Sequence, residues 1–324
     1  MNSTDGMEKA GPRFLRGKQS GLLFVRPKNS IFVPRYPMRK SMKSKKKFVC
    51  RVFAMLVWAG WGGTAWAAEP ADTLEQVSVD RKVVLPVKKN NRVEFTLHVD
   101  FPSDTHAHLK RNMTGWIDGL LSTLTGVKGP DETPASTPER LIGYYEKEYL
   151  KKSRDEIVEI LKLREKGTEH PVNYVVDMSV KRRYETPRLI TYSAEAYLYG
   201  GGAHGMTYTV YVSFRKNDGR QLTWDDLVVP KMKKTFSTWV ADGVMRYFGM
   251  TDFENLRGNL LIEKPYSRTS FPLPAGGPGL LADGLRVQYA LYEIAPYAAG
   301  APSVTIPYAQ LQKVLTPVAK QLLK

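Results

Sequence analysis

The apolar residues of this chain repeat with two different periods, and this change of period constrains the fold more than any other feature. Residues 92–101 alternate apolar and polar side chains, as a strand with one buried face does. Residues 109–124 carry apolar side chains at helical spacing, residues 172–214 return to strand-like composition, and the end of the chain is helical again. We therefore expect an α+β protein, in which an antiparallel β meander packs with several helices and a C-terminal helix closes the domain.

Local signals place the ends of the expected helices. Ser103 or Asp104 can cap the first helix, and Gly126 can end it. Thr137-Pro138-Glu139 opens a second helix, with proline at the first helical position. Ser153 and Glu156 have the spacing of a capping box. Either a third helix runs from Arg154 to Gly167, or the second helix continues through this stretch. Residues 68–79 are polar and are expected to form a loose start.

The expected meander has three strands, residues 172–184, 188–199 and 206–214, with a glycine-rich turn at 200–205. Thr223 is expected to cap a helical turn that contains Asp226 and Leu227. An amphipathic helix (235–247), two strands (284–292 and 303–306) and a terminal helix that starts at Pro307 complete the prediction.

The residues before Ala68 resemble a leader that is removed from the folded protein. Residues 42–67 contain four lysines, the apolar stretch 52–60 and the sequence Ala65-Trp66-Ala67, which are the parts of a secretory signal peptide cleaved between Ala67 and Ala68. The apolar stretch is well short of the roughly 20 residues that span a bilayer, so we expect no retained membrane anchor. Residues 1–41 are not needed for this leader, and we interpret them as an over-called start.

Removing the leader changes the meaning of the charge. The whole chain carries +16, but residues 1–67 hold 14 of its 48 Lys and Arg and only 2 of its 32 Asp and Glu, so residues 68–324 carry +4. This near balance gives no reason to expect nucleic-acid binding. The single cysteine, Cys50, lies in the leader, so the remaining chain has no disulfide, metal–thiolate site or cysteine nucleophile.

Two segments resemble a known family. The first is Glu195–His204, with Phe214, Asp218-Gly219 and Leu222 to Leu227 after it, and the second is Tyr289–Gly300, followed by Ile306-Pro307-Tyr308 and Leu311. Together they are similar to the RsiV-type extracytoplasmic domain of unknown function. This domain occurs in the anti-sigma factor RsiV and beside the catalytic domain of PdaC-type peptidoglycan deacetylases. The resemblance covers most of residues 171–324 and leaves residues 68–170 as a separate strand–helix region.

The resemblance implies an extracytoplasmic binding module, because RsiV is a receptor for lysozyme. Its motif positions supply the candidate binding residues, which are Gly201, Gly202, His204, Tyr199, Glu195, Glu293 and Tyr297. The glycines and His204 admit two interpretations. They either let a ligand approach the backbone or allow a tight connection between strands. The many tyrosines of the meander either pack the sheet or form an aromatic face for a glycan or a protein.

Motifs for catalysis and metal binding are weak. His106 and His108 lie where a helix starts, so their side chains diverge, and no metal or cofactor is expected. A polysaccharide deacetylase needs an Asp-Asp pair and an H-x-x-x-H pair, and Asp225-Asp226 is better explained as a helix cap. The G-x-S-x-G elbow of serine hydrolases is also absent from the sequence.

Three functions remain open on the sequence. The first is a non-catalytic periplasmic or secreted binding module, whose ligand is a peptidoglycan fragment or another cell-wall glycan, or a wall-degrading enzyme such as lysozyme. The alternative is an envelope hydrolase that uses His204 and a nearby carboxylate such as Glu195 or Glu293. The third is a structural envelope protein whose loops stabilise an oligomer.

Overall fold

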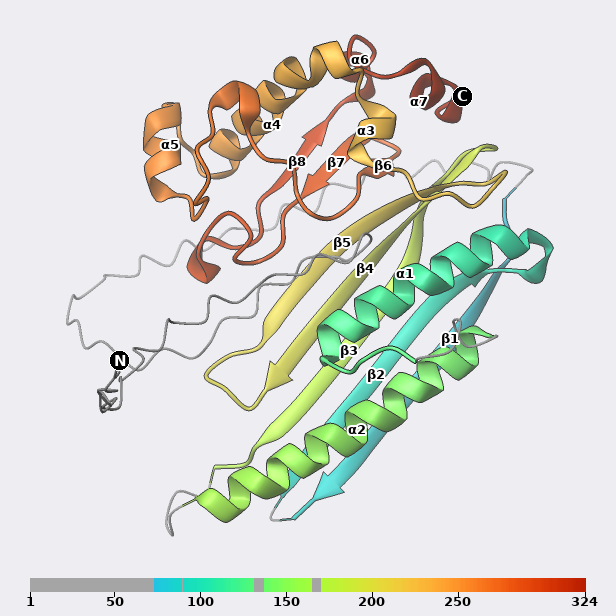
Figure 1. The fold of residues 1–324 in the computed structure, drawn as a ribbon, viewed down its shortest axis with the longest axis vertical. Coiled ribbons are helices and arrows are strands. Elements are labelled where there is room, and N and C mark those ends of the chain that lie inside the picture. The colour runs from blue at the N-terminus through green and yellow to red at the C-terminus, as the bar shows by residue number, and fades with distance from the viewer. Residues whose placement is uncertain (1–72, 89, 131–136, 165–169) are drawn as a thin grey trace, which may run out of the picture. The chain divides into compact units, whose positions relative to one another are not determined.

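The computed structural model describes residues 73–324, apart from residues 89, 131–136 and 165–169. The predicted leader, its cleavage site at Ala67 and Ala68, and residues 1–41 lie outside this part of the chain. The described residues form a five-stranded sheet in the order β1-β2-β3-β4-β5, a three-stranded sheet in the order β6-β7-β8, and helices beside both (Figure 1). This mixture confirms the α+β class.

The first sheet combines the predicted meander with two earlier strands. Its strands are β1 (Gln76–Val87), β2 (Asn91–Pro102), β3 (Asn173–Glu185), β4 (Leu189–Gly200) and β5 (Met206–Arg215). All neighbouring pairs are antiparallel except β2 and β3, which run parallel. The two helices between them in the sequence provide the crossover connection that parallel strands need. The predicted boundary between residues 170 and 171 therefore separates β2 from β3, although strands from both sides of it belong to the same sheet.

The strand β1 corrects the expectation of a loose start up to residue 79, since the strand begins at Gln76. This strand is at the edge of the sheet, and even Val77 and Val84 are 42% and 49% exposed. An edge strand needs fewer buried apolar residues and commonly carries charges. Its sequence therefore shows little of the alternation that identifies β2.

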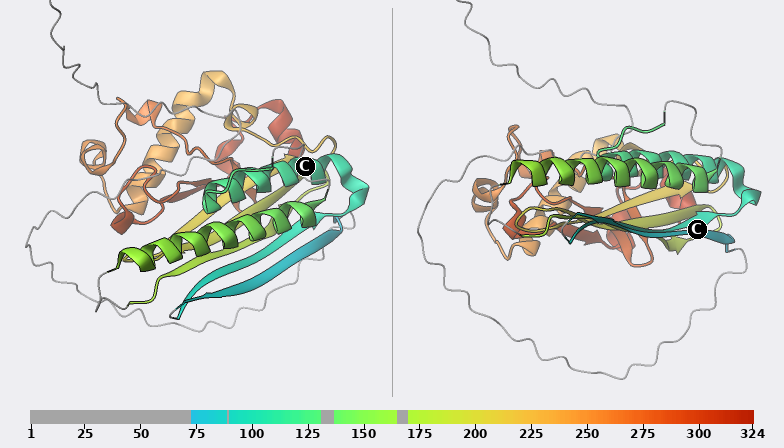
Figure 2. Two further views of the ribbon diagram at one scale, coloured as in Figure 1. Left: turned by 60° about the horizontal axis from the view of Figure 1, so that its bottom comes forward. Right: turned by 90° about the horizontal axis from the view of Figure 1, so that it is seen from below.

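Two long helices cover one face of this sheet, α1 (Ala107–Thr125) and α2 (Pro138–Leu163) (Figure 2). The odd-numbered residues of β2 face them, and all five from Val93 to Phe101 are at most 1% exposed. The predicted helix end is confirmed, because Gly126 has φ +61° and its N–H donates to Ser122 O at 3.0 Å. Thr137 caps α2 through the N–H of Arg140 at 3.4 Å.

The continuous form of α2 is the correct alternative, and a separate helix from Arg154 is wrong. Ser153 is 2% exposed and lies beside Tyr149, so its side chain faces the core and does not cap a new helix. Because the backbone hydrogen bonds of α2 continue through Ser153, the apparent capping box of Ser153 and Glu156 has no helix end to cap.

The second sheet consists of β6 (Gly279–Leu281), β7 (Gly284–Gln288) and β8 (Ser303–Ile306). Around it lie α3 (Trp224–Leu227), α4 (Lys233–Tyr247), α5 (Phe253–Asn259), α6 (Tyr308–Leu311) and α7 (Pro317–Leu322). The strand predicted over 284–292 is shorter than expected. It ends at Gln288, and the chain then turns through Tyr292, whose φ is +65°.

The two sheets meet through hydrogen bonds at Ser213 of β5. Its hydroxyl donates to Pro278 O at 2.9 Å and accepts from Leu280 N at 3.1 Å. Gly279 lies so close to this strand that a Cβ atom there would be 2.7 Å from the Tyr211 ring. The second sheet therefore packs against the face of β5 that α1 and α2 leave open.

A single terminal helix from Pro307 is also wrong, because two short helices, α6 and α7, take its place. Between them, Leu315 forms a β-bridge with Val228, and Thr316 N donates to Leu227 O at 2.8 Å. Thr316 then caps α7 through the N–H of Ala319. These contacts with residues distant in the sequence outweigh the local helical spacing. Within the described residues, no helix has the length and apolar content needed to cross a bilayer.

Candidate functional site

The glycine-rich turn at residues 200–205 connects β4 to β5 and carries three of the predicted site residues. Gly201 has φ +74°, and a Cβ atom there would lie 2.9 Å from Val172 Cγ1. The hydroxyl of Tyr199 donates to Gly202 O at 2.9 Å, which closes the turn onto the end of β4. Gly201 thus has a structural role in this turn, whereas a Cβ atom at Gly202 would have no atom within 4 Å.

A segment from the C-terminal part of the chain reaches this turn. The rings of His204 and Tyr297 stack with their centroids 4.2 Å apart and their planes at 26°. The hydroxyl of Tyr297 donates to Gly205 O at 2.9 Å, and His204 Nδ1 lies 3.1 Å from the same oxygen. On the same segment, the ring centroid of Tyr292 lies 5.8 Å from that of Tyr297. The structure therefore brings together two predicted residues that are far apart in the sequence.

We call the rings gathered here the tyrosine–histidine cluster, which consists of Tyr197, Tyr199, His204, Tyr292 and Tyr297. Tyr197 is 42% exposed and His204 is exposed, while the other three are partly buried. The Tyr197 ring lies directly over Gly205, where a Cβ atom would be only 2.3 Å from it.

The cluster has a buried neighbour in Tyr208 of β5. The pKa of the Tyr208 hydroxyl is raised to about 12, mainly because the group is buried and to a smaller extent because Tyr292 lies nearby. Tyr208 belongs to the core of the first sheet, and Tyr197 and His204 are the exposed rings of the cluster. Such rings can stack on an apolar ligand surface while their hydroxyls form hydrogen bonds.

Glu195, another predicted site residue, lies on β4 and forms an ion pair with Arg183 of β3. The same arginine donates from Nε to Ser193 Oγ at 2.6 Å. Glu195 and Tyr197 are two residues apart on one strand, so they share a face of the sheet. The contacts of Glu195 are those of a cross-strand ion pair.

Glu293 links two loops. Its Oε1 accepts from Ala275 N at 2.6 Å, and its Oε2 accepts from Ala290 N at 2.7 Å. Burial raises the pKa of Glu293, and these two hydrogen bonds offset only part of that effect. The carboxylate therefore connects the loop before β6 to the turn that leads to Tyr297.

The remaining histidines are dispersed. His98 lies on the open face of β2, with Nδ1 2.8 Å from Asp80 Oδ1 and Nε2 3.1 Å from Asp100 Oδ1. His108 contacts Arg111, and His170 is exposed before Pro171. Across the described part of the chain, no three His, Cys, Asp or Glu side chains gather where a metal ion would bind.

Asp226 is a helix-capping residue, as the sequence predicts. Its Oδ2 accepts from both the N–H and the hydroxyl of Thr223 at 2.8 Å, and it also pairs with Arg220. Burial on its own would raise the pKa of Asp226, but these hydrogen bonds outweigh burial and lower it. Its neighbour Asp225 forms an exposed ion pair with Lys233.

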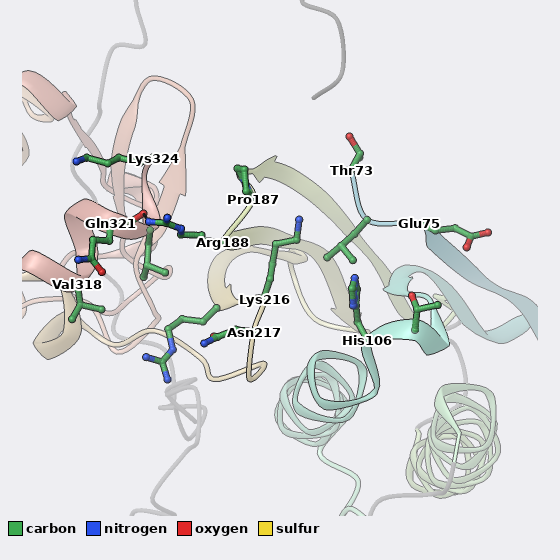
Figure 3. Close-up of a pocket in the computed structure, with 14 residues that line it drawn as sticks. Thr73, Glu75, His106, Pro187, Arg188, Lys216, Asn217, Val318, Gln321 and Lys324 are labelled. Carbon is green, nitrogen blue, oxygen red and sulfur yellow. Dashed lines mark hydrogen bonds between the residues drawn. The ribbon is translucent and has the colours of Figure 1, made fainter. Parts of the chain in front are cut away.

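A cleft of about 960 Å³ opens at the opposite end of β4 and β5 from the glycine-rich turn (Figure 3). None of the predicted site residues lines it. Among its charged residues, Arg188 directly precedes β4, whereas Arg215 and Lys216 lie at the end of β5. Each of them looks like an ordinary turn residue in the sequence, so no local pattern identifies the cleft.

Comparison with known proteins gives a family match and a fold match. Residues 225–309 match the family model described as "Protein of unknown function (DUF3298)". A crystal structure of a DUF3298 family member from Bacteroides fragilis is similar, with a TM-score of 0.60 and 20% identity, over 78% of this chain and 99% of that one. A DUF3298 family protein from Pseudomonas aeruginosa has a TM-score of 0.54 and 17% identity, over 76% of this chain and 97% of that one.

No curated protein matches the chain. The family match includes Glu293 and Tyr297 but begins after the glycine-rich turn at residues 200–205. Residues 225–309 thus carry a DUF3298 match, and the described chain resembles two solved DUF3298 proteins in fold.

Proposed function

We propose that the chain from about Ala68 onward is an extracytoplasmic, non-catalytic binding module whose ligand is a cell-wall glycan. The observation that carries this proposal is the tyrosine–histidine cluster, in which the stacked rings of His204 and Tyr297 are held at the hairpin turn by a hydrogen bond to Gly205 O. The export of the chain rests on the predicted leader, and amino-terminal sequencing of the protein from cells tests it. An amino terminus at Ala68 supports export, and an intact Trp66 contradicts it.

The physical chemistry of the cluster suits a glycan. A pyranose ring has apolar C–H faces and hydroxyls at its rim, so it matches aromatic rings that also carry hydroxyls. Tyrosine provides a large contact area with few rotatable bonds, and it therefore loses little conformational entropy on binding. The hydrogen bonds from Tyr199 and Tyr297 to loop carbonyls restrict the rings before any ligand arrives, which lowers the cost of association.

The resemblance to the RsiV-type domain adds a second ligand class, a wall-degrading enzyme such as lysozyme. The charge of the chain gives little support for that partner. Residues 68–324 carry only +4, and a net positive charge does not steer a protein towards basic lysozymes. We therefore rank a peptidoglycan fragment above lysozyme as the ligand.

The hydrolase alternative needs a carboxylate that acts with His204. Glu195 pairs with Arg183, and Glu293 accepts two backbone N–H groups. These contacts explain both carboxylates without His204, so no observation favours catalysis over binding.

The test is calorimetric titration of purified residues 68–324 with a disaccharide-tetrapeptide from peptidoglycan, and separately with hen lysozyme. We expect Tyr297→Ala and His204→Ala to weaken glycan binding about tenfold each, equivalent to about 1.4 kcal/mol. Tyr144→Ala is the matched control, because Tyr144 is a partly buried tyrosine on α2 whose hydroxyl donates to Lys128 O.

Three results contradict the proposal. Binding of lysozyme without binding of the glycan would show that the ligand is the enzyme. An equal loss of glycan affinity in the control and the cluster variants would show that the cluster is not the binding site. Cleavage or deacetylation of the fragment by the wild type, lost in His204→Ala, would establish the hydrolase alternative.

A further inference from the structure

The cleft at the far end of β4 and β5 is a separate place for a ligand. β4 has 12 residues, so at about 3.3 Å per residue its two ends lie about 36 Å apart. The glycine-rich turn follows one end, and the cleft lies at the other. Its volume of about 960 Å³ is within the roughly 300–1,000 Å³ of small-molecule sites.

A network of ion pairs and hydrogen bonds supports one side of the cleft. Lys216 is 10% exposed and lies 2.7 Å from Glu185 Oε1, and Glu185 is 7% exposed. Glu185 also pairs with Arg182 and accepts from Leu74 N at 2.8 Å. This network fixes the start of β1 against the ends of β3 and β5, which form one side of the cleft. Arg215, which also lines the cleft, pairs with Asp218.

The Arg188 guanidinium differs from these paired cations. Its Nη1 donates to Gln321 O at 2.9 Å, which orients the group against α7. Within the described residues, no hydrogen bond or ion pair engages its Nε and Nη2. These atoms form one planar edge of the guanidinium, and such an edge matches the two oxygens of a carboxylate.

Further groups of the lining complement this edge. His106 of the 3₁₀ turn and Asn217 after β5 line the cleft, and neither side chain forms a hydrogen bond to another described residue. Figure 3 shows His106 on one side, Arg188 and Gln321 on the other, and Lys216 between them. Val318, 49% exposed on α7, adds an apolar wall.

We propose that this cleft binds a small organic carboxylate, with the Nε and Nη2 edge of Arg188 as its anchor. His106 and Asn217 supply polar contacts to the rest of the ligand, and Val318 contacts a short apolar group. Of the four Lys and Arg of the lining, Lys216 and Arg215 are paired with Glu185 and Asp218. Arg188 and Lys324, whose side chains form no ion pair with another described residue, favour a ligand with negative charge. The planar edge can pair with two oxygens of a carboxylate or of a phosphate, and the apolar wall of Val318 favours an organic carboxylate over inorganic phosphate. This site does not depend on the tyrosine–histidine cluster or on its ligand.

The test uses N-acetylvaline, which combines one carboxylate with a short apolar group, and follows its binding by ¹⁵N NMR titration of residues 68–324. N-acetylvaline amide is the uncharged control ligand, and inorganic phosphate is the control anion. We expect saturable shifts of the Arg188 Nε–H signal and of backbone signals around His106 with the acid. The amide should bind at least tenfold more weakly.

Variants complete the test. Arg188→Gln should raise the Kd at least tenfold, and Arg188→Lys should recover little of the loss, because lysine keeps the charge but lacks the planar edge. Arg154→Gln is the matched control, since Arg154 is an exposed arginine on α2 that pairs with Asp155. His106→Ala is a second cleft variant that leaves the Arg188–Gln321 bond intact, and thermal unfolding reports whether each variant folds.

Four outcomes overturn the proposal. They are equal affinity for acid and amide, tighter binding of phosphate to the same residues, unchanged affinity in folded Arg188→Gln, and no saturable shift of cleft signals up to the solubility limit of the acid. None of these outcomes bears on glycan binding at the hairpin turn, so the two proposals fail separately.

Discussion

Replacing Gly205 by alanine tests whether the glycine-rich turn holds the tyrosine–histidine cluster in place. The added Cβ would lie 2.3–2.4 Å from the Cε2, Cζ and Oη atoms of Tyr197, so the ring has to move by about 1 Å or more to reach ordinary contact distances. Because Tyr197 is 42% exposed, it can turn towards solvent and the backbone need not shift.

The cost of this movement has two parts. A side chain forced from its preferred rotamer costs about 0.5–1.5 kcal/mol. Re-exposing about 30 Å² of the ring at about 25 cal/mol per Å² adds about 0.75 kcal/mol. We therefore expect Gly205→Ala to lower the free energy of unfolding by about 1–2 kcal/mol. For a domain of this size that corresponds to a loss of about 2–8 °C in Tm.

Gly202 supplies the matched control, because no atom lies within 4 Å of the position where its Cβ would be. Gly202→Ala should leave stability unchanged or raise it by up to about 1 kcal/mol, since alanine restricts the unfolded chain. Urea unfolding followed by circular dichroism measures both variants. Adding Tyr197→Ala to Gly205→Ala should remove most of the loss. Equal stability of the two glycine variants, or no coupling with Tyr197, would refute the reasoning.

Two further predictions concern the part of the chain around the second sheet. Glu293→Gln should flatten the pH dependence of stability, whereas the exposed Glu263→Gln should not. The raised pKa of Glu293 means that the folded state holds this proton more tightly than the unfolded chain. Its contribution to stability is therefore full below the ordinary glutamate pKa and is lost as the pH rises through the raised pKa, which urea unfolding at a series of pH values measures. Gly243→Ala places a Cβ 2.1 Å from Val304 Cγ1, between α4 and β8, and should cost about 1–3 kcal/mol by overpacking. Adding Val304→Ala should recover part of that loss, and a double-mutant cycle that shows no coupling would contradict the proposed contact.

The hydrophobic periods and the caps were sufficient to predict most of the elements. The alternation in β2 and the helical spacing in α1 depend on which side of one element is buried, and that is a local property of the sequence. Gly126, Thr137 and Thr223 marked helix ends because each satisfies backbone groups within a few residues. The error at β1 reflects its edge position, where few apolar residues are buried. The break between α6 and α7 and the end of β7 involve contacts with residues farther away along the chain.

The site was predicted by residue type but not by arrangement. The sequence singled out His204 and Tyr297 only as members of two motifs. The loop connected through Glu293 places their rings in contact. The cleft around Arg188 was missed entirely, because its lining comes from five separate segments of the chain.

The sequence by itself determined the α+β composition, the hairpin that ends in a glycine-rich turn, and a chain after the predicted leader that has no cysteine and little net charge. Only the tertiary structure decided the parallel pairing of β2 with β3, the stacking of His204 on Tyr297, and the orientation of Arg188 by α7. Local patterns record the backbone and burial preferences of neighbouring residues. Packing selects contacts between distant segments from many combinations with similar local energies, so a single sequence does not reveal them.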